Sequence, residues 1–277
     1  MTDTAVDESL TGNGGSADTP ALELRDLSKS FGAVRAAREV SFAVRRGEVL
    51  GLLGDNGAGK TTVVNCISGS YQPDSGVILV DGEPVDIPDP HAARDLGIET
   101  VYQDLALVET LDVVSNMFLG RELKLRSRLL KWTGWMDRRR MQHETVENLN
   151  RLHINIPSVK SIVAQLSGGQ RQAVSVGRAV AWGRHIVLLD EPAAALGVEQ
   201  TELVLTLIKR LRDQGVAVVL ISHNMHDVLE VCDRVVVLRH GTNIGEIDDL
   251  SGVTTRDLVD MITGVTLGET DVRHQEF

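Results

Sequence analysis

Hydrophobic positions change their spacing along the chain in a way that predicts alternating strands and helices. Residues 22–31 (LELRDLSKSF) alternate between apolar and polar side chains, which is typical of a strand, and a second run, VSFAV, follows. Residues 198–213 place apolar side chains at helical spacing. Residues 48–53 predict a short apolar strand, and two later apolar runs, 186–189 and 217–221, predict buried parallel strands. This order of strand and helix predicts a parallel sheet with helices on its faces.

The middle third of the chain has a different pattern. From about residue 105 to residue 180 the apolar spacing is mostly helical. Within it, residues 121–140 carry eight basic residues and two tryptophans. The chain contains no internal repeat, which predicts a single unit rather than a tandem pair.

The ends of the chain differ in composition from the rest. Residues 1–20 contain no Lys or Arg and no apolar run, so they lack the features of a secretory signal. Such a segment buries too little apolar surface to offset the entropy of ordering, which predicts a disordered tail. We expect an ordered domain at 21–264, with a helical subdomain at about 105–183, and a C-terminal tail at 265–277.

Composition and charge exclude several classes of protein. Lys and Arg number 28 and Asp and Glu 39, a net charge of −11, which disfavours general binding of nucleic acid. The only cysteines, Cys66 and Cys232, form no zinc-type spacing, and a reduced, cytoplasmic setting is the simplest interpretation. No run of about 18 apolar residues is present, so we expect no membrane-spanning segment.

A glycine-rich loop follows the apolar run at 48–53. The sequence GDNGAGKTT fits the phosphate-loop pattern, with Lys60 placed to reach the outer phosphates and Thr61 placed to bind Mg²⁺. A chance match to a glycine-rich turn is the alternative, and the strand before the loop and the helix after it disfavour that alternative. We assign nucleotide binding to the whole loop: Gly54, Asp55, Asn56, Gly57, Ala58, Gly59, Lys60, Thr61 and Thr62.

Acidic side chains follow the apolar run at 186–189. Asp190 is placed to hold Mg²⁺ and Glu191 to orient or deprotonate the attacking water, the two functions that hydrolysis of a phosphoanhydride requires. The next strand ends in Ser222-His223, where His223 is placed to contact the γ-phosphate or to be an ordinary polar turn residue. His226 lies three residues further on, but no third ligand accompanies the pair, so we predict no metal site other than that of nucleotide Mg²⁺.

The segment LSGGQ, residues 166–170, opens a predicted helix about 20 residues before the acidic strand end. It resembles the signature of ABC ATPases, and the resemblance extends over about residues 21–264. The resemblance implies an α/β fold: a P-loop NTPase (RecA-like) core, an antiparallel β subdomain and an inserted α-helical subdomain. It also implies an ATPase that binds ATP and Mg²⁺.

The resemblance implies a role for each matching residue. Phe31 resembles the aromatic residue that stacks on adenine, with a core phenylalanine as the alternative, and His223 resembles the switch histidine. Gln103 resembles the Q-loop glutamine that senses Mg²⁺ and the permease. The signature residues would hold the γ-phosphate of ATP bound to a second, identical subunit: Ser167, Gly168, Gly169 and Gln170.

A finer resemblance points to import of sugars. The phrases ISGSYQPDSG, NMFLGRE, AALG and ISHNM resemble the ATPases of bacterial monosaccharide importers of the ribose, xylose and fructose type. This implies integral-membrane permease subunits as partners, an indirect connection to a substrate-binding protein, and a position on the inner face of the cell membrane. The segment 121–140 would then face the permease, unless it is only a solvated basic surface.

One departure from the family pattern concerns the D-loop, which usually reads SALD. Here Ala194-Ala195-Leu196-Gly197 lacks the acidic side chain, so the family's D-loop contacts across a dimer are in doubt. Two alternatives to a transport ATPase are an ABC ATPase that acts in repair or translation without a permease, and a subunit that does not hydrolyse ATP. The absence of a long coiled coil or second ATPase domain disfavours the first, and the presence of Glu191 disfavours the second.

Overall fold

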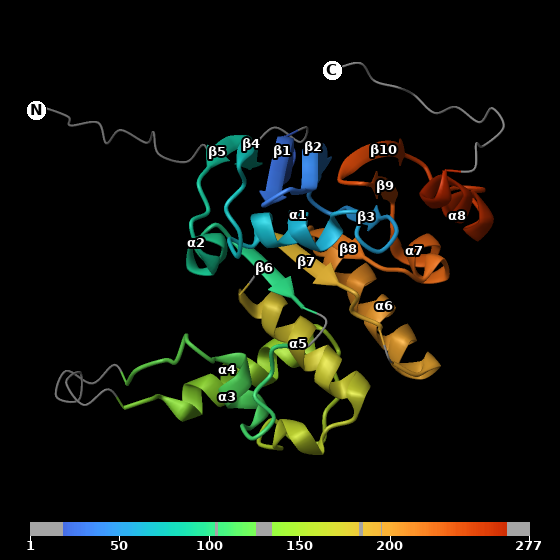
Figure 1. Cartoon of the computed structure of the whole chain (residues 1–277). Helices are drawn as coiled ribbons and strands as arrows, with labels where there is room; N and C mark the ends of the chain where they lie inside the picture. Colours follow the sequence, from blue (N-terminus) through green and yellow to red (C-terminus); the bar gives the residue numbers. More distant parts are fainter. Residues whose placement is uncertain (1–18, 103–104, 126–134, 183–184, 195, 265–277) are drawn as a thin grey trace, which may run out of the picture.

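The computed structural model describes residues 19–102, 105–125, 135–182, 185–194 and 196–264 (Figure 1). Most of the predicted tails, 1–20 and 265–277, lie outside these ranges, and the predicted domain boundaries stay a prediction. The described part contains two sheets and a set of helices that cover them.

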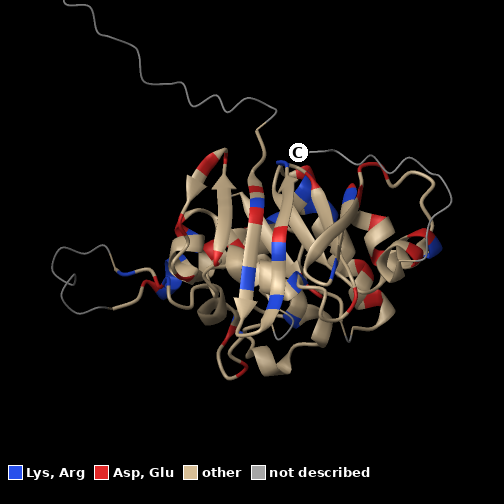
Figure 2. Cartoon of the chain, turned by 45° about the horizontal axis from the view of Figure 1, so that its top comes forward, with Lys and Arg blue, Asp and Glu red and all other residues tan. Residues whose placement is uncertain are grey.

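An antiparallel sheet of four strands has the order β2-β1-β4-β5. Its strands are β1 (Leu22–Phe31), β2 (Val34–Val44), β4 (Ser75–Val80) and β5 (Glu83–Val85). Acidic and basic residues are interspersed along β1 and β2 (Figure 2). Lys29 of β1, for example, forms an ion pair of 2.9 Å with Asp74. One face of this sheet therefore carries polar side chains, and the strand predicted at 22–31 is confirmed.

A second sheet of six strands has the order β10-β9-β3-β8-β7-β6 and is parallel except at β10. Its strands are β3 (Val49–Leu53), β6 (Ile98–Val101), β7 (Ile186–Asp190), β8 (Ala217–Ile221), β9 (Arg234–Arg239) and β10 (Thr242–Ile247). Strands β3 and β8 are buried along their whole length, because both faces of the sheet are covered. The predicted buried strands and their parallel pairing are confirmed.

Helices cover the six-stranded sheet and form the middle third of the chain. They are α1 (Lys60–Ile67), α2 (Pro90–Asp95), α3 (Val113–Met117), α4 (Arg138–Arg151), α5 (Gly168–Trp182), α6 (Val198–Asp213), α7 (Met225–Val231) and α8 (Thr255–Thr263), with a short 3₁₀ helix at Val163–Gln165. Helix α1 lies between the two sheets, whereas α3, α4 and α5 lie together beyond β6 (Figure 1).

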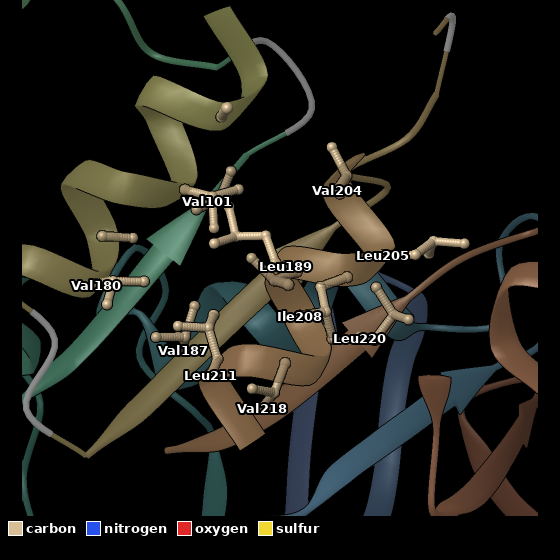
Figure 3. Packing of buried hydrophobic residues seen from close by; sticks show 14 of the residues in the cluster. Val101, Val180, Val187, Leu189, Val204, Leu205, Ile208, Leu211, Val218 and Leu220 are labelled. Carbon is tan, nitrogen blue, oxygen red and sulfur yellow. The ribbon is translucent and has the colours of Figure 1, made fainter. Parts of the chain in front are cut away.

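Two hydrophobic cores lie on opposite faces of the six-stranded sheet. In β3, Leu50 and Leu52 contribute to the core shared with α1 and the antiparallel sheet, while Val49 and Leu53 contribute to the other. On that other face, α5 and α6 pack against β6, β7 and β8, and Ile208 and Leu211 of α6 lie over the strands (Figure 3). Because a one-residue slip of a strand would exchange the two sets of side chains, these cores specify its register.

The basic segment 121–140 is not a continuous helix. Lys124 and Met136 form an isolated antiparallel bridge, and the Leu125 amide donates a hydrogen bond to the Trp135 carbonyl oxygen (3.0 Å). Asp137 then caps helix α4 by accepting a hydrogen bond from the Arg140 amide (3.1 Å). Residues 126–134 lie outside the described residues.

Replacement of Arg234, at the start of β9, tests how the two sheets are joined. Its guanidinium donates to Glu48 (2.7 Å) and to the Ala43 carbonyl oxygen, and both side chains are 10% exposed. We expect Arg234→Ala to lower the free energy of unfolding by about 3–5 kcal/mol, because Glu48 would remain buried without its partner. Urea denaturation measures this loss.

The matched control is Arg256→Ala, which removes an 88% exposed arginine 3.6 Å from Asp260. Its effect should stay at about 0.5 kcal/mol or less, since exposed helical ion pairs contribute little. Similar losses in the two variants would contradict a special role for the buried pair.

Candidate active site

The glycine loop connects β3 to α1 in a conformation that only glycine allows at two of its positions. Gly54 has φ 149°, and a Cβ atom there would lie 2.3 Å from the Leu238 carbonyl oxygen. Gly59 has φ 104°, and a Cβ atom there would lie 2.4 Å from the Ala36 carbonyl oxygen. Both distances are too short for any side chain, so the loop is pressed against neighbouring backbone and its other side remains open to a ligand.

The backbone amides in the first turn of α1 are available to donate hydrogen bonds to an anion. Gly59 is the residue before the helix, and no side chain of the described residues caps the first-turn amides. Uncapped amides and the positive end of the helix attract phosphate oxygens. Asp55, Asn56, Gly57 and Thr61 are exposed around this opening.

Lys60 lies across the loop. Its Nζ donates to the carbonyl oxygens of Gly54 (2.8 Å) and Asp55 (3.0 Å). Burial lowers the pKa of Lys60, while the charges of Glu191, Asp190 and Asp55 oppose this shift. The ammonium is therefore partly desolvated, which strengthens its attraction to a bound phosphate.

Asp190 and Glu191 leave the carboxyl end of β7 beside Lys60. Burial raises the pKa of Asp190, the neighbouring Glu191 charge raises it further, and Lys60 lowers it. Glu191 has φ 50°, a left-handed conformation that is strained for a residue with a Cβ atom. Its amide donates to the Ile221 carbonyl oxygen of β8 (2.9 Å), which holds this turn against the adjacent strand end.

His223 follows β8 and lies next to Glu191. The distance from His223 Nδ1 to Glu191 Oε1 is 3.3 Å, and the histidine side chain is 71% exposed. His226 is exposed on α7, and within the described ranges no group of three or more His, Cys, Asp or Glu side chains is arranged to hold a metal ion. The structure thus brings together the predicted residues of the phosphate loop, β7 and β8.

The signature segment forms the first turn of α5 and caps itself. The Gln170 amide donates to Ser167 Oγ (3.3 Å), and the Ser167 amide donates to Gln170 Oε1 (3.0 Å). This reciprocal pair satisfies two helix-end donors and leaves Ser167 exposed. A Cβ atom on Gly169 would lie 2.4 Å from Gln200 Cγ, so only glycine fits against α6 at this position.

Gln200 also occupies the space beside Gly197, where the usual acidic residue of the D-loop is missing. A Cβ atom on Gly197 would lie 2.5 Å from Gln200 Oε1. No side chain of the described residues caps the start of α6 at Gly197. Sequence reasoning did not find Gln200, because only the packing of α6 on α5 brings it to both glycines.

Phe31 lies at the end of β1 with 44% of its surface exposed, which excludes the alternative of a core phenylalanine. Its ring meets that of Tyr71 edge-on, with 5.1 Å between the centroids. Tyr71 is 39% exposed and was missed in the sequence, although it lies in the phrase ISGSYQPDSG. Gln103, predicted as the Q-loop residue, lies outside the described residues.

Comparisons with known proteins identify the family of the chain. Residues 37–194 match the ABC transporter family. The chain is 43% identical over 249 residues to the fructose import ATP-binding protein of Rhizobium meliloti, covering 90% of this chain and 95% of that protein. It is 41% identical over 251 residues to the xylose/arabinose import ATP-binding protein of Sulfolobus acidocaldarius, covering 91% and 97%.

Solved structures share the fold. A nucleotide-free ATP-binding cassette from an ABC transporter aligns with a TM-score of 0.74 at 23% identity, covering 90% of this chain and 100% of that one. A dimeric cassette in a post-hydrolysis state, bound to ADP and Pi, aligns with a TM-score of 0.68 at 26% identity, covering 83% and 98%. The predicted fold class is confirmed. The chain belongs to the ABC transporter family, as a nucleotide-binding cassette that hydrolyses ATP.

Proposed function

We propose that this chain hydrolyses ATP to energise the import of a monosaccharide through a permease formed by separate membrane proteins. The meeting of Lys60, Asp190 and Glu191 at one edge of the sheet is the observation that carries the catalytic part of the proposal. The names of the two sugar-import relatives, which match over nearly their whole length, support the transport part. They also disfavour a role in repair or translation.

The geometry suggests how each side chain contributes. Lys60 and the amides of the loop 54–62 bind and orient the phosphates, since phosphoryl transfer depends mainly on positioning and charge stabilisation. Glu191 accepts a proton from the attacking water as the water oxygen bonds to the γ-phosphorus and the bond to the leaving ADP oxygen breaks. His223, 3.3 Å from Glu191, is placed to contact the γ-phosphate and to orient the carboxylate.

The oxygen donors at the site suit Mg²⁺. Asp190 is a half-buried carboxylate and Thr61 carries an exposed hydroxyl at the start of α1. Mg²⁺ prefers oxygen ligands and is commonly bound by one or two protein groups together with phosphates. We infer that Asp190 and Thr61 hold it, with Gln103 as a further ligand, and that the ion neutralises charge on the phosphates.

Membership of the ABC transporter family indicates which proteins this chain binds. We infer that the cassette binds integral-membrane permease subunits at the inner face of the cell membrane, and through them works with a substrate-binding protein. Among the described helices, none is long and apolar enough to cross a membrane.

Two copies would complete the nucleotide sites. Ser167 is exposed, and the atoms nearest to the Cβ positions of Gly168 and Gly169 belong to Leu196 and Gln200, not to the phosphate loop. A solved cassette bound to ADP and Pi is dimeric. We infer that the signature of one subunit binds the γ-phosphate of ATP held by the phosphate loop of the other.

Glu191→Gln tests the general base. The amide fills the same space but cannot accept the proton, so we expect turnover to fall at least about a hundredfold while ATP affinity stays within about threefold. Steady-state ATPase and equilibrium nucleotide binding measure the two effects. Glu202→Gln, the same change at an exposed position of α6, is the control and should behave as wild type. Turnover of Glu191→Gln close to that of the control would refute the assignment.

Phe31→Ala tests adenine stacking. Loss of one stacking contact is worth about 1–3 kcal/mol, so ATP affinity should fall while preference for ATP over GTP changes little, because a ring face contacts any base. Val77→Ala, at a position that is also 44% exposed, serves as the control. Unchanged affinity for both nucleotides in Phe31→Ala would remove Phe31 from the site.

Mixed dimers test the composite site. One tagged chain carries Lys60→Ala and Glu191→Gln, and a differently tagged chain carries Ser167→Arg and Glu191→Gln. Only the mixed pair contains a site with an intact loop and an intact signature, so ATP should promote co-purification of the two tags. The Glu191→Gln chain alone is the positive control. ATP-dependent dimers of that control without any mixed dimer would contradict the composite site.

A further inference from the structure

The loop that follows α1 holds the end of β1 in place. The Asp74 carboxylate accepts hydrogen bonds from Lys29 Nζ (2.9 Å) and from the Ser30 amide (2.7 Å). The Asp74 amide donates to the Ser28 carbonyl oxygen (2.8 Å). The hydrogen bonds from Lys29 and Ser30 lower the pKa of Asp74, so its carboxylate stays ionised at neutral pH. The three residues that precede Phe31 are therefore all attached to one residue of this loop.

Two side chains contact the Phe31 ring itself. Lys29 is only 17% exposed, and its Nζ lies over the ring, 5.7 Å from the centroid. The Tyr71 ring lies at 72° to the Phe31 ring, with 5.1 Å between the two centroids. A cation over an aromatic ring and an edge-to-face ring pair are both attractive arrangements. The Phe31 ring is thus held from two directions, while 44% of the residue stays exposed to a ligand.

Tyr71 is in turn fixed to helix α1. Its amide donates to the Asn65 carbonyl oxygen (2.9 Å) in the last turn of that helix. The same helix begins at Lys60, in the loop that binds the phosphates in the proposed function. A helix of 8 residues extends about 12 Å along its axis. Because a single helix connects them, α1 sets the separation between the phosphate loop and the aromatic pair of Phe31 and Tyr71.

We propose that Tyr71 and Lys29 are positioning residues that orient the Phe31 ring for stacking on the adenine base of the nucleotide. The proposal rests on the role of Phe31 in the proposed function. A phenylalanine without neighbours at the end of a strand rotates about its side-chain bonds, and a rotated ring loses its overlap with the base. The two contacts restrict this rotation before the nucleotide binds, so less conformational entropy is lost on binding.

A double-mutant cycle in the full chain tests this inference. Tyr71→Ala should raise the Kd for ATP about threefold to tenfold, because an aromatic pair contributes about this much. The kcat should stay within about twofold, since the phosphate loop and Glu191 are unchanged. A purely structural loss would instead lower kcat with the folded fraction and leave Kd unchanged. In a Phe31→Ala background, Tyr71→Ala should raise Kd by no more than about 1.5-fold.

Three further variants sharpen the test. Tyr71→Phe keeps the ring, so Kd should stay within about twofold of wild type. Lys29→Met keeps an unbranched chain but removes the cation from the ring, and should raise Kd about twofold to fivefold only when Phe31 is present. Trp135→Ala is the matched control, because it removes a 67% exposed aromatic side chain from the segment before α4. It should leave Kd unchanged in both backgrounds.

The outcomes separate the inference from the function beneath it. If Tyr71→Ala binds ATP as tightly as Trp135→Ala, or raises Kd by the same factor with and without Phe31, the inference fails. The role of Phe31 still stands in that case if Phe31→Ala itself weakens binding. If Phe31→Ala leaves Kd unchanged, the assigned role of Phe31 fails together with the inference. The Glu191→Gln result is independent of these outcomes and tests the ATPase assignment alone.

Discussion

The parallel pairing of β3 with β8, and of β8 with β7, is the constraint on which the active site depends. Register places Val49 beside Val218 and Asp190 beside Ile221. Because parallel strands end at the same edge, the groups that follow these three strands meet there, although they are far apart in the chain. Both faces of the strands are buried in separate cores, which prevents the slip that would misplace those groups.

Among the described residues with a strained, left-handed backbone, one is the candidate general base Glu191. Glu191 adopts a left-handed conformation that a hydrogen bond to the end of β8 supports. Leu105 and Ala106 also adopt a left-handed conformation, supported by hydrogen bonds from Ser175 and Arg178 of α5. In each case a neighbouring element holds the strained turn, so the geometry of the site depends on packing between elements rather than on the turn alone.

The two surfaces that would bind one ATP molecule are built in different ways. The phosphate loop is pressed at Gly54 and Gly59 against the backbone of β9 and β2, so its shape depends on close approach to two other strands. The signature turn of α5 is shaped by its own cap and by Gln200 of α6, which also fills the space beside Gly197.

The sequence alone determined the buried strands, the phosphate loop, the acidic strand end and the signature, because each depends on local spacing and residue type. It also predicted the neighbourhood of Glu191 and His223, since parallel strands end at one edge. Only the tertiary structure decided that Tyr71 lies against Phe31 and that Gln200 packs on Gly169. It also decided that Arg178 donates a hydrogen bond to the Ala106 carbonyl oxygen after β6. These contacts join residues whose local patterns are ordinary, and they arise only when helices pack on the sheet and on one another.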